Sequence, residues 1–360
     1  METYLVGGAV RDELLGLPVK ERDFVVVGAT PEQMKTAGFL QVGRDFPVFL
    51  HPETREEHAL ARTERKTGPG HRGFEVHASP EVTLEEDLVR RDLTINAIAK
   101  RSDGTLIDPC GGCRDIDARL LRHVSGAFTE DPLRILRIAR FRARLHHLGF
   151  EIAPETLALL EDMVSQRMLE ELSPDRIIGE LDKALETPDP VCFFELLAQI
   201  GAGDVLWPEL KPADIERLKS NDPEEAEARF CQLVHTHSAA DIESLCRRLH
   251  CSNLRRELAV MVSLLISEWP DFRGFDATRI ASFIGSADGL RKRDRFEKFA
   301  AIADAIQKTQ VSDLWLKALE TMAAVRAADI PGNIKGPALG ALIQEEQLRR
   351  LSDLIENPAS

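Results

Sequence analysis

The stretch that decides the fold is Tyr4-Leu-Val-Gly7-Gly8-Ala-Val-Arg11-Asp12, and Glu21-Arg-Asp23-Phe-Val-Val-Val27 follows it closely. The pattern predicts a strand over 3–6, a two-glycine turn, a helix of about two turns ending near Gly16, and a strand over 23–27. Glycines between a strand and a helix let backbone N–H groups approach a phosphate closely, and the helix N-terminus favours an anion. The beginning of the chain therefore predicts a phosphate site.

Two acidic residues stand beside this expected phosphate site. Glu21 and Asp23 are two residues apart at the start of the second strand, so the alternation of a strand points both carboxylates the same way. Mg²⁺ prefers hard oxygen ligands and bridges substrate phosphates. The combination of glycines and carboxylates indicates a nucleotidyl transfer site that uses two metal ions.

The composition limits the classes of protein that fit. The chain has 360 residues, of which 43% are hydrophobic, enough for two or three domains with packed cores. Its net charge of −14 argues against a strongly electrostatic nucleic-acid binder, although it permits a local basic groove. The longest apolar run, 258–266, is too short to span a bilayer. No signal peptide is expected before Gly7, and six scattered cysteines suggest the cytoplasm.

The organisation along the chain changes after the first third. Alternating strands and helices are expected to about residue 115, with further strands at 47–50 and 57–62. A capping box at Thr83–Glu86 predicts a helix that continues through Ala97. From about residue 127 helical periodicity dominates to the end of the chain. The sequence therefore predicts a small head of mixed structure and a long helical body.

Two further groups of polar residues are candidates for a nucleotide site. In the expected helix, Arg91 suits a triphosphate, and Asp92 with Asn96, at i and i+4, suits a ribose hydroxyl. A polar stripe follows at helical spacing: Asp131, Arg134, Arg137, Arg140 and Arg144. No acidic residue is interleaved after Asp131, so an anion opposite the arginines is a better explanation than solvent.

The pair Asp131 and Arg134 suggests a way to choose a base without a template. Cytosine and adenine each present an amine donor beside a ring-nitrogen acceptor, whereas uracil and guanine present the opposite pattern. A carboxylate only accepts hydrogen bonds and a guanidinium only donates them. The pair would therefore accept C and A, and each buried mismatch with U or G would cost roughly 1–3 kcal/mol.

The chain resembles the class II tRNA nucleotidyltransferases, the bacterial CCA-adding enzymes. The resemblance covers about residues 1–210 strongly and the remainder weakly, and it rests on four ordered motifs: Leu5-Val-Gly7-Gly8-x-Val-Arg11-Asp12, Arg90-Arg91-Asp92-x-Thr-x-Asn96-Ala, Asp108-Pro-x-x-Gly112 and Glu130-Asp131-x-x-Arg134. It implies an α+β fold, with a polymerase β-like nucleotidyltransferase head (1–125), a helical neck (126–210), and a helical body and tail (211–360). It also implies that the protein uses CTP and ATP with Mg²⁺ to build or repair the 3′ CCA end of tRNA.

The resemblance also implies roles for particular residues. Glu21 and Asp23 would be the catalytic metal ligands, and Glu57 stands where a third carboxylate is expected. Asp131 and Arg134 would recognise the base. The nucleotide phosphates and sugar would be contacted by Gly8, Arg11, Arg91, Arg137 and Arg140.

Two departures from the family leave alternatives open. Glu21 replaces an aspartate, which leaves the metal preference open because Mg²⁺ tolerates poor octahedral geometry badly. In the body, His235-Thr236-His237 stands where relatives carry the His-Asp centre of a phosphohydrolase, which favours a degenerate remnant. The alternatives are a narrower enzyme that adds only CC, only A or a poly(A) tail, decided by the loop Lys66–Gly73, or a catalytically silent RNA-binding protein.

Overall fold

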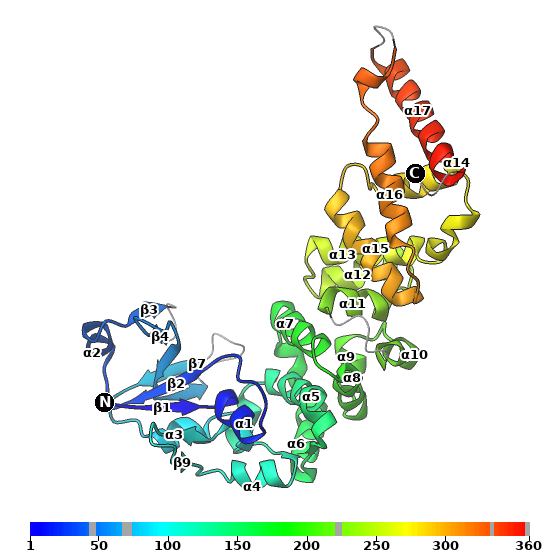
Figure 1. The fold of residues 1–360 in the computed structure, drawn as a ribbon. Coiled ribbons are helices and arrows are strands. Elements are labelled where there is room, and N and C mark those ends of the chain that lie inside the picture. Colours follow the sequence, from blue (N-terminus) through cyan, green and yellow to red (C-terminus); the bar gives the residue numbers. More distant parts are fainter. Residues whose placement is uncertain (43–47, 67–73, 220–224, 332–334, 357–360) are drawn as a thin grey trace. The chain divides into compact units, whose positions relative to one another are not determined.

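The computed structural model describes residues 1–42, 48–66, 74–219, 225–331 and 335–356, in two compact units, Met1–Pro208 and Glu209–Ser360 (Figure 1). The first unit contains one large sheet, whose strands are β1 (Glu2–Val6), β2 (Asp23–Val27), β3 (Leu40–Val42), β4 (Val48–Leu50), β5 (Glu57–Leu60), β8 (Ala99–Lys100) and β9 (Leu106–Ile107). Their order is β3-β4-β5-β2-β1-β8-β9, and only β2 and β5 are parallel among these neighbours. The mixed sheet confirms the expected α+β head.

Successive side chains of β2 point to opposite faces of the sheet, and both faces are covered. Val25 packs on one face with Tyr4 and Leu88, and Val26 packs on the other face with Met34. Because both faces of the strand are covered, its apolar run is continuous rather than alternating. The buried strand fixes the position of Asp23 at its start.

Three short helices accompany the sheet: α1 (Gly8–Leu14), α2 (Pro31–Thr36) and α3 (Leu84–Val89). The capping box at Thr83 is confirmed, since its side chain accepts from the Glu86 N–H and Glu86 accepts in return. The expectation that this helix continues to Ala97 is wrong, because α3 ends at Val89 and a short 3₁₀ turn follows at Thr94–Asn96.

The reason for the early end of α3 lies in Asp92. Its carboxylate accepts a hydrogen bond from the N–H of Leu93 at 2.8 Å, and Leu93 itself is extended. Aspartate competes with helical hydrogen bonding in this way. The chain then returns to the sheet, where Thr94 N–H donates to the carbonyl of Arg122 at 2.9 Å.

The expected strand over 57–62 is two strands in the structure. After β5 ends at Leu60, β6 (Arg62–Lys66) pairs with β7 (Phe74–Ala78) in a separate antiparallel hairpin. The loop that was expected to decide the choice of nucleotide falls on 67–73, which lies outside the described residues. The strand at 47–50 is confirmed over Val48–Leu50.

The rest of the first unit is mostly helical. Its elements are α4 (Gly112–Asp117), β10 (Leu120–Leu121), α5 (Leu133–Leu145), β11 (Glu151–Ile152), α6 (Pro154–Ser165), α7 (Pro174–Leu185), α8 (Pro190–Gln199) and α9 (Gly203–Leu206). Helix α5 buries Ile135, Ile138 and Phe141 and packs against α7 and α8. Its opposite stripe therefore stays available for the arginines.

The second unit consists of helices in the part of the chain that the structure describes. The main ones are α10 (Pro212–Glu216), α11 (Ala226–Val234), α12 (Ala239–Arg248), α13 (Asn253–Leu265), α14 (Ala277–Ser286), α15 (Arg293–Gln307), α16 (Ser312–Ala323) and α17 (Pro337–Glu356). Trp269 and Trp315 stack at its centre with ring centroids 5.3 Å apart. No helix among the described residues has the length and apolar character needed to cross a membrane. The division of the first unit into head and neck near residue 125 stays a prediction.

Candidate active site

All but one of the residues singled out from the sequence as metal or nucleotide ligands line one hollow of about 580 Å³ in the first unit. They come from α1, from the start of β2 and the segment before it, from the segment after α3, and from α5 and the segment before it. The residues are Gly8, Arg11, Glu21, Asp23, Arg91, Asp131, Arg134, Arg137 and Arg140. Glu57 does not line this hollow but lines a neighbouring one that shares Glu21 and Asp23.

The guanidinium of Arg91 lies next to the two-glycine turn. Gly7 has a φ of +68°, a conformation that side chains other than glycine rarely adopt. A Cβ atom built on Gly7 would lie 2.9 Å from Nη1 of Arg91, so the missing side chain also makes room for that guanidinium. The turn and Arg91 therefore form one side of the hollow together.

The two carboxylates lie where β2 begins. Asp23 stands opposite Val6 of β1 and Glu57 of β5 in the register of the sheet. Burial and the nearby charge of Glu21 raise the pKa of Asp23, and Arg91 opposes the shift only in part. Two exposed carboxylates that repel each other suit a cation that both could bind.

A metal ion here would need more ligands than the protein supplies. Among the residues that the structure describes, no three Asp, Glu, His or Cys side chains are arranged to hold a metal ion. Mg²⁺ commonly takes one or two carboxylates and completes its shell with waters and substrate phosphates. The donor set of Glu21 and Asp23 fits such an open site.

Arg91 is held by a residue that the sequence analysis missed. Asp87 on α3 is buried, and its Oδ2 accepts from Nη2 of Arg91 at 3.1 Å. Its Oδ1 accepts from the N–H of Arg62 at 3.3 Å, at the start of β6. The spacing of four residues between Asp87 and Arg91 was the available signal.

A chain of polar contacts joins α1 to the segment after α3. Arg11 is only 2% exposed, and it donates to Oδ1 of Asp12 at 2.8 and 2.9 Å and to Oδ1 of Asn96 at 2.5 Å. Asn96 in turn donates from Nδ2 to Oδ1 of Asp92 at 3.0 Å. Asp92 and Asn96 therefore lie together, as their spacing suggests, although a 3₁₀ turn rather than an α-helix places Asn96.

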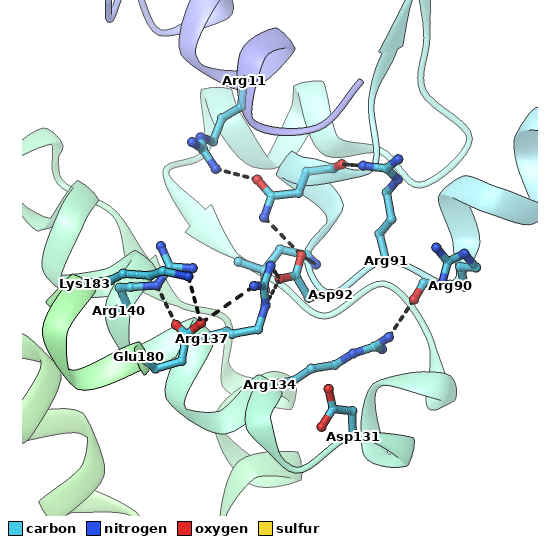
Figure 2. Close-up of polar contacts among 12 residues, drawn as sticks. Arg11, Arg90, Arg91, Asp92, Asp131, Arg134, Arg137, Arg140, Glu180 and Lys183 are labelled. Atoms are coloured by element: carbon cyan, nitrogen blue, oxygen red, sulfur yellow. Dashed lines mark hydrogen bonds and ion pairs between the residues drawn. The ribbon is translucent and has the colours of Figure 1, made fainter. Parts of the chain in front are cut away.

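The arginine stripe of α5 faces carboxylates of the protein itself (Figure 2). Arg137 binds Oδ2 of Asp92 through Nε at 2.9 Å and Nη2 at 2.7 Å. Arg140 donates from Nε to Oε2 of the buried Glu180 on α7 at 2.6 Å. Although burial acts in the opposite direction, Arg137 holds the pKa of Asp92 well below its usual range. Carboxylates of the protein therefore supply part of the negative charge that the sequence predicts opposite the arginines.

Arg144, the last arginine of the stripe, also binds a carboxylate of the protein. Arg144 donates to Oδ2 of Asp12 at 2.7 Å, so the two carboxylates Asp12 and Asp92 each bind an arginine of α5. These contacts fix α5 against α1 and the segment after α3. Glu180 and Asp12 were missed as partners because they are distant in sequence from α5.

Asp131 and Arg134, which are expected to recognise the base, are both hydrogen-bonded to other groups of the protein. Arg176 on α7 binds Asp131 through both oxygens, at 3.1 and 2.9 Å, and the N–H of Leu133 donates to Oδ1 at 3.1 Å. Arg134 donates to the carbonyl of Ala127 at 3.0 Å and to that of Arg90 at 2.8 Å, a contact drawn in Figure 2. Both side chains therefore have fixed directions in the hollow.

The histidines of the second unit are not arranged as a metal site among the described residues. The ring of His235 hydrogen-bonds through Nδ1 with the carbonyl of Gln232 at 2.9 Å, and burial lowers its pKa. His237 contacts Asp214 at 2.9 Å.

The fold and the hollow define a nucleotidyltransferase, and the comparisons with known proteins agree. The family described as Poly A polymerase head domain matches residues 3–122. A second family, described as a probable RNA and SrmB-binding site of polymerase A, matches residues 149–214. Proteins of this class generally use a divalent metal ion.

Relatives with similarity over the whole chain narrow the class. The multifunctional CCA protein of Teredinibacter turnerae is 44% identical, covering 98% of this chain and 97% of that protein. The CCA-adding enzyme of Coxiella burnetii is 44% identical, covering 99% and 96%. The structure of the Bacillus stearothermophilus CCA-adding enzyme with CTP superposes with a TM-score of 0.72 at 26% identity, covering 98% and 89%. The chain belongs to the family of CCA-adding enzymes.

Proposed function

We propose that this protein adds and repairs the 3′-terminal CCA of tRNA, using CTP and ATP and releasing pyrophosphate. One observation carries the proposal: a single hollow is lined by two carboxylates, by a glycine turn with arginines, and by Asp131 and Arg134. The membership in the family of CCA-adding enzymes supplies the substrates. The protein is accordingly an enzyme that binds tRNA and nucleotides.

The metal ions of the proposal are two Mg²⁺, held by Glu21 and Asp23. When bound there, they would neutralise the phosphates and favour the ionised form of the attacking hydroxyl. The tRNA 3′-oxygen forms a bond to the α-phosphorus as the bond to pyrophosphate breaks, and the hydroxyl proton passes to solvent. Pyrophosphate leaves with the bonding electron pair.

The residues around the carboxylates position the nucleotide. Arg91 lies over the glycine turn and Gly8 begins α1, so both are placed to contact the triphosphate. Arg137 and Arg140 stand farther along α5 and face the same hollow, in keeping with contacts to phosphate or sugar. Arg11 holds Asn96 in position, because its guanidinium is buried and donates a hydrogen bond to Asn96.

The choice of base is assigned to Asp131 and Arg134. Asp131 accepts from the exocyclic amine and Arg134 donates to the ring nitrogen of cytosine or adenine. Uracil and guanine would place a carbonyl opposite the carboxylate and an N–H opposite the guanidinium, so they are rejected. The bidentate pair with Arg176 keeps Asp131 in one orientation for this purpose.

The expected place of action is the cytoplasm, where tRNA is found. All six cysteines are free thiols, which suits a reducing compartment. We assign no phosphohydrolase activity to the second unit, in which Thr236 stands between the two histidines.

One experiment tests the proposed function. A tRNA that ends before CCA, after its first C, or after CC is incubated with Mg²⁺ and each labelled triphosphate in turn. We expect C on the first two substrates and A on the third, with no extension of a complete CCA end. A protein that adds only C, only A, or a run of A would be one of the narrower enzymes, and binding without addition would indicate a silent RNA-binding protein.

A further inference from the structure

Two of the six cysteines meet where helix α12 of the second unit ends (Figure 1). The N–H of Cys251 donates to the carbonyl of Cys246 at 2.9 Å, and the N–H of His250 donates to the carbonyl of Arg247 at 3.4 Å. His250 itself has a φ of +55°. These two hydrogen bonds around a left-handed residue form a Schellman motif, which ends many helices and brings the side chains at its two ends into contact. In this chain both of those side chains are cysteines.

The Schellman motif places the two sulfur atoms within reach of each other. With standard bond lengths, the backbone hydrogen bond keeps the two Cα atoms no farther apart than about 6.8 Å, within the range that a disulfide spans. The thiols of Cys246 and Cys251 are also hydrogen-bonded to each other, and this contact and burial raise the pKa of Cys246 far above its ordinary value. Cys246 is therefore the thiol that keeps its proton.

Cys251 differs from Cys246 in its access to solvent. Cys246 is 2% exposed, whereas Cys251 is partly exposed and is followed by exposed residues at 252–254. Cys251 also directly precedes Ser252, the N-cap of α13, and the charge of the buried Arg255 acts on the pair, since it opposes the rise in the pKa of Cys246. A helix N-terminus and a cation favour the ionised, nucleophilic form of a nearby thiol. Cys251 is therefore the accessible nucleophile of the pair.

The segment Cys110-Gly-Gly-Cys113 in the first unit provides a comparison within the same chain. Its two thiols are also partly exposed. Burial and the charge of Asp108 raise the pKa of Cys110, and the same two causes raise the pKa of Cys113 to about 11. Because the thiolate is the reactive form of cysteine, this pair is poorly suited to react at neutral pH, despite its spacing.

We propose that Cys246 and Cys251 form a site of reversible oxidation, at which a hydroperoxide joins them in a disulfide. The sulfur of Cys251 attacks one peroxide oxygen, the O–O bond breaks, and hydroxide leaves with the electron pair and takes up a proton to become water. The sulfur of Cys246 then attacks the resulting sulfenic acid, the S–O bond breaks, and a second water leaves with the Cys246 proton. The two thiols thus give up two electrons, and the peroxide is reduced to two waters. This site is independent of the proposed nucleotidyl transfer.

Peptide mapping of the full chain tests the proposal. Trypsin cuts after Arg247 and Arg248, between the two cysteines, so the peptides 230–247 and 249–255 stay together only when a disulfide joins them. The protein is treated with equimolar hydrogen peroxide at neutral pH, its remaining thiols are blocked, and the digest is compared with and without dithiothreitol. Fragment ions then show whether the bond in peptide 230–247 involves Cys246 or Cys231.

The variants are Cys251→Ser and, as the matched control, Cys110→Ser, which removes another partly exposed thiol. We expect the wild type and Cys110→Ser to give equal yields of the linked peptides, with the bond between Cys246 and Cys251, and dithiothreitol should separate them. Cys251→Ser should give no linked peptides. The wild-type peptide 102–114, which contains Cys110 and Cys113, should be recovered with both thiols reduced.

Other results would overturn the inference. A wild type without linked peptides would show that the pair does not form a disulfide. A bond from Cys251 to Cys231 would assign the oxidation to a different pair. Equal oxidation of Cys110 and Cys113 would show that the Schellman motif and the neighbouring charges give the pair at α12 no preference.

Discussion

The residues of the site divide into two groups by their partners. Glu21 and Asp23 repel each other, while Arg11, Arg137 and Arg140 are bound to protein groups. Of the three arginines only Arg11 is buried, and Arg137 and Arg140 still line the hollow. We therefore assign the binding of a cation to the carboxylates, and to Arg137 and Arg140 both the support of the site and contact with the nucleotide.

The first prediction concerns Asp23. The pKa of Asp23 is higher in the folded protein than in the unfolded chain. Between these two pKa values, the folded state therefore binds more protons than the unfolded state. Stability therefore falls with rising pH through this window, and the ionised Asp23 destabilises the metal-free protein at neutral pH. Asp23→Asn should raise the urea midpoint at pH 7 in the presence of a chelator, less so as the pH falls towards about 4, and should abolish nucleotide addition.

The control for Asp23→Asn is Asp117→Asn, at an exposed position of α4. This variant should leave both the activity and the midpoint near those of the wild type. Added Mg²⁺ should stabilise the wild type and the control but not Asp23→Asn. Normal nucleotide addition by Asp23→Asn would contradict the assignment of Asp23 as a metal ligand. So would a gain of stability from Mg²⁺ in this variant that equals the gain of the wild type.

Most residues of the candidate site could be predicted from the sequence, because they fall in short motifs with fixed spacing. The glycine turn, the two carboxylates and Asp131 with Arg134 all line the expected hollow. The partners that hold them could not be predicted. Glu180 and Arg176 bind residues about 40 positions earlier, and neither periodicity nor local spacing identifies a contact over that distance.

At the scale of elements, helix α5 organises the site. Its apolar face is anchored by α7 and α8, and its polar face carries the arginines towards the head. The sequence predicted both faces from their helical period. It did not predict that Asp12, Asp92 and Glu180 converge on the polar face, since these come from three separate elements.

The secondary structure was predicted best where a segment obeys local rules. The helix at α1 and the strands β1, β2 and β4 are confirmed. The extension of α3 through Asn96 was wrong because the Asp92 side chain binds the backbone and Leu93 pairs with His123 in an isolated bridge. A tertiary contact of this kind overrides helical propensity.

The second prediction concerns Gly112, the first residue of α4. A Cβ atom on Gly112 would lie 2.2 Å from the Thr94 carbonyl oxygen, in the segment that carries Asn96. Gly112→Ala should therefore destabilise the head by about 2–3 kcal/mol through overpacking. The matched control is Gly126→Ala, where no atom lies within 4 Å of the added carbon. Equal urea midpoints for the two variants would show that the start of α4 can shift away from Thr94 without cost.

At the scale of the whole molecule, the chain pairs a catalytic first unit with a helical second unit. The family match to the head covers residues 3–122, and the second match ends at residue 214. The sequence predicted the helical character of the second unit. It contains no motif that would identify residues of this unit as RNA ligands, because binding of a folded RNA backbone depends on shape and charge rather than on a short pattern.

The third prediction concerns the second unit. His235 and His237 contact Gln232 and Asp214 rather than forming a metal centre in the described residues. We expect no hydrolysis of 2′,3′-cyclic nucleotides with Mg²⁺, Mn²⁺ or Ni²⁺. The assay compares the wild type with His235→Ala. A metal-dependent activity that disappears in His235→Ala would overturn the view of this region as a degenerate remnant.

We propose that Asp131 and Arg134 choose the nucleotide in place of a template. The decisive measurement is single-turnover incorporation of all four triphosphates by the wild type, Asp131→Ala and Arg140→Ala. Asp131→Ala should turn over more slowly and incorporate UTP and GTP at raised relative rates, since the acceptor opposite the base amine is lost. Arg140→Ala should weaken all nucleotides about equally, as phosphates carry no base identity. Full preference for C and A in Asp131→Ala would contradict the claim.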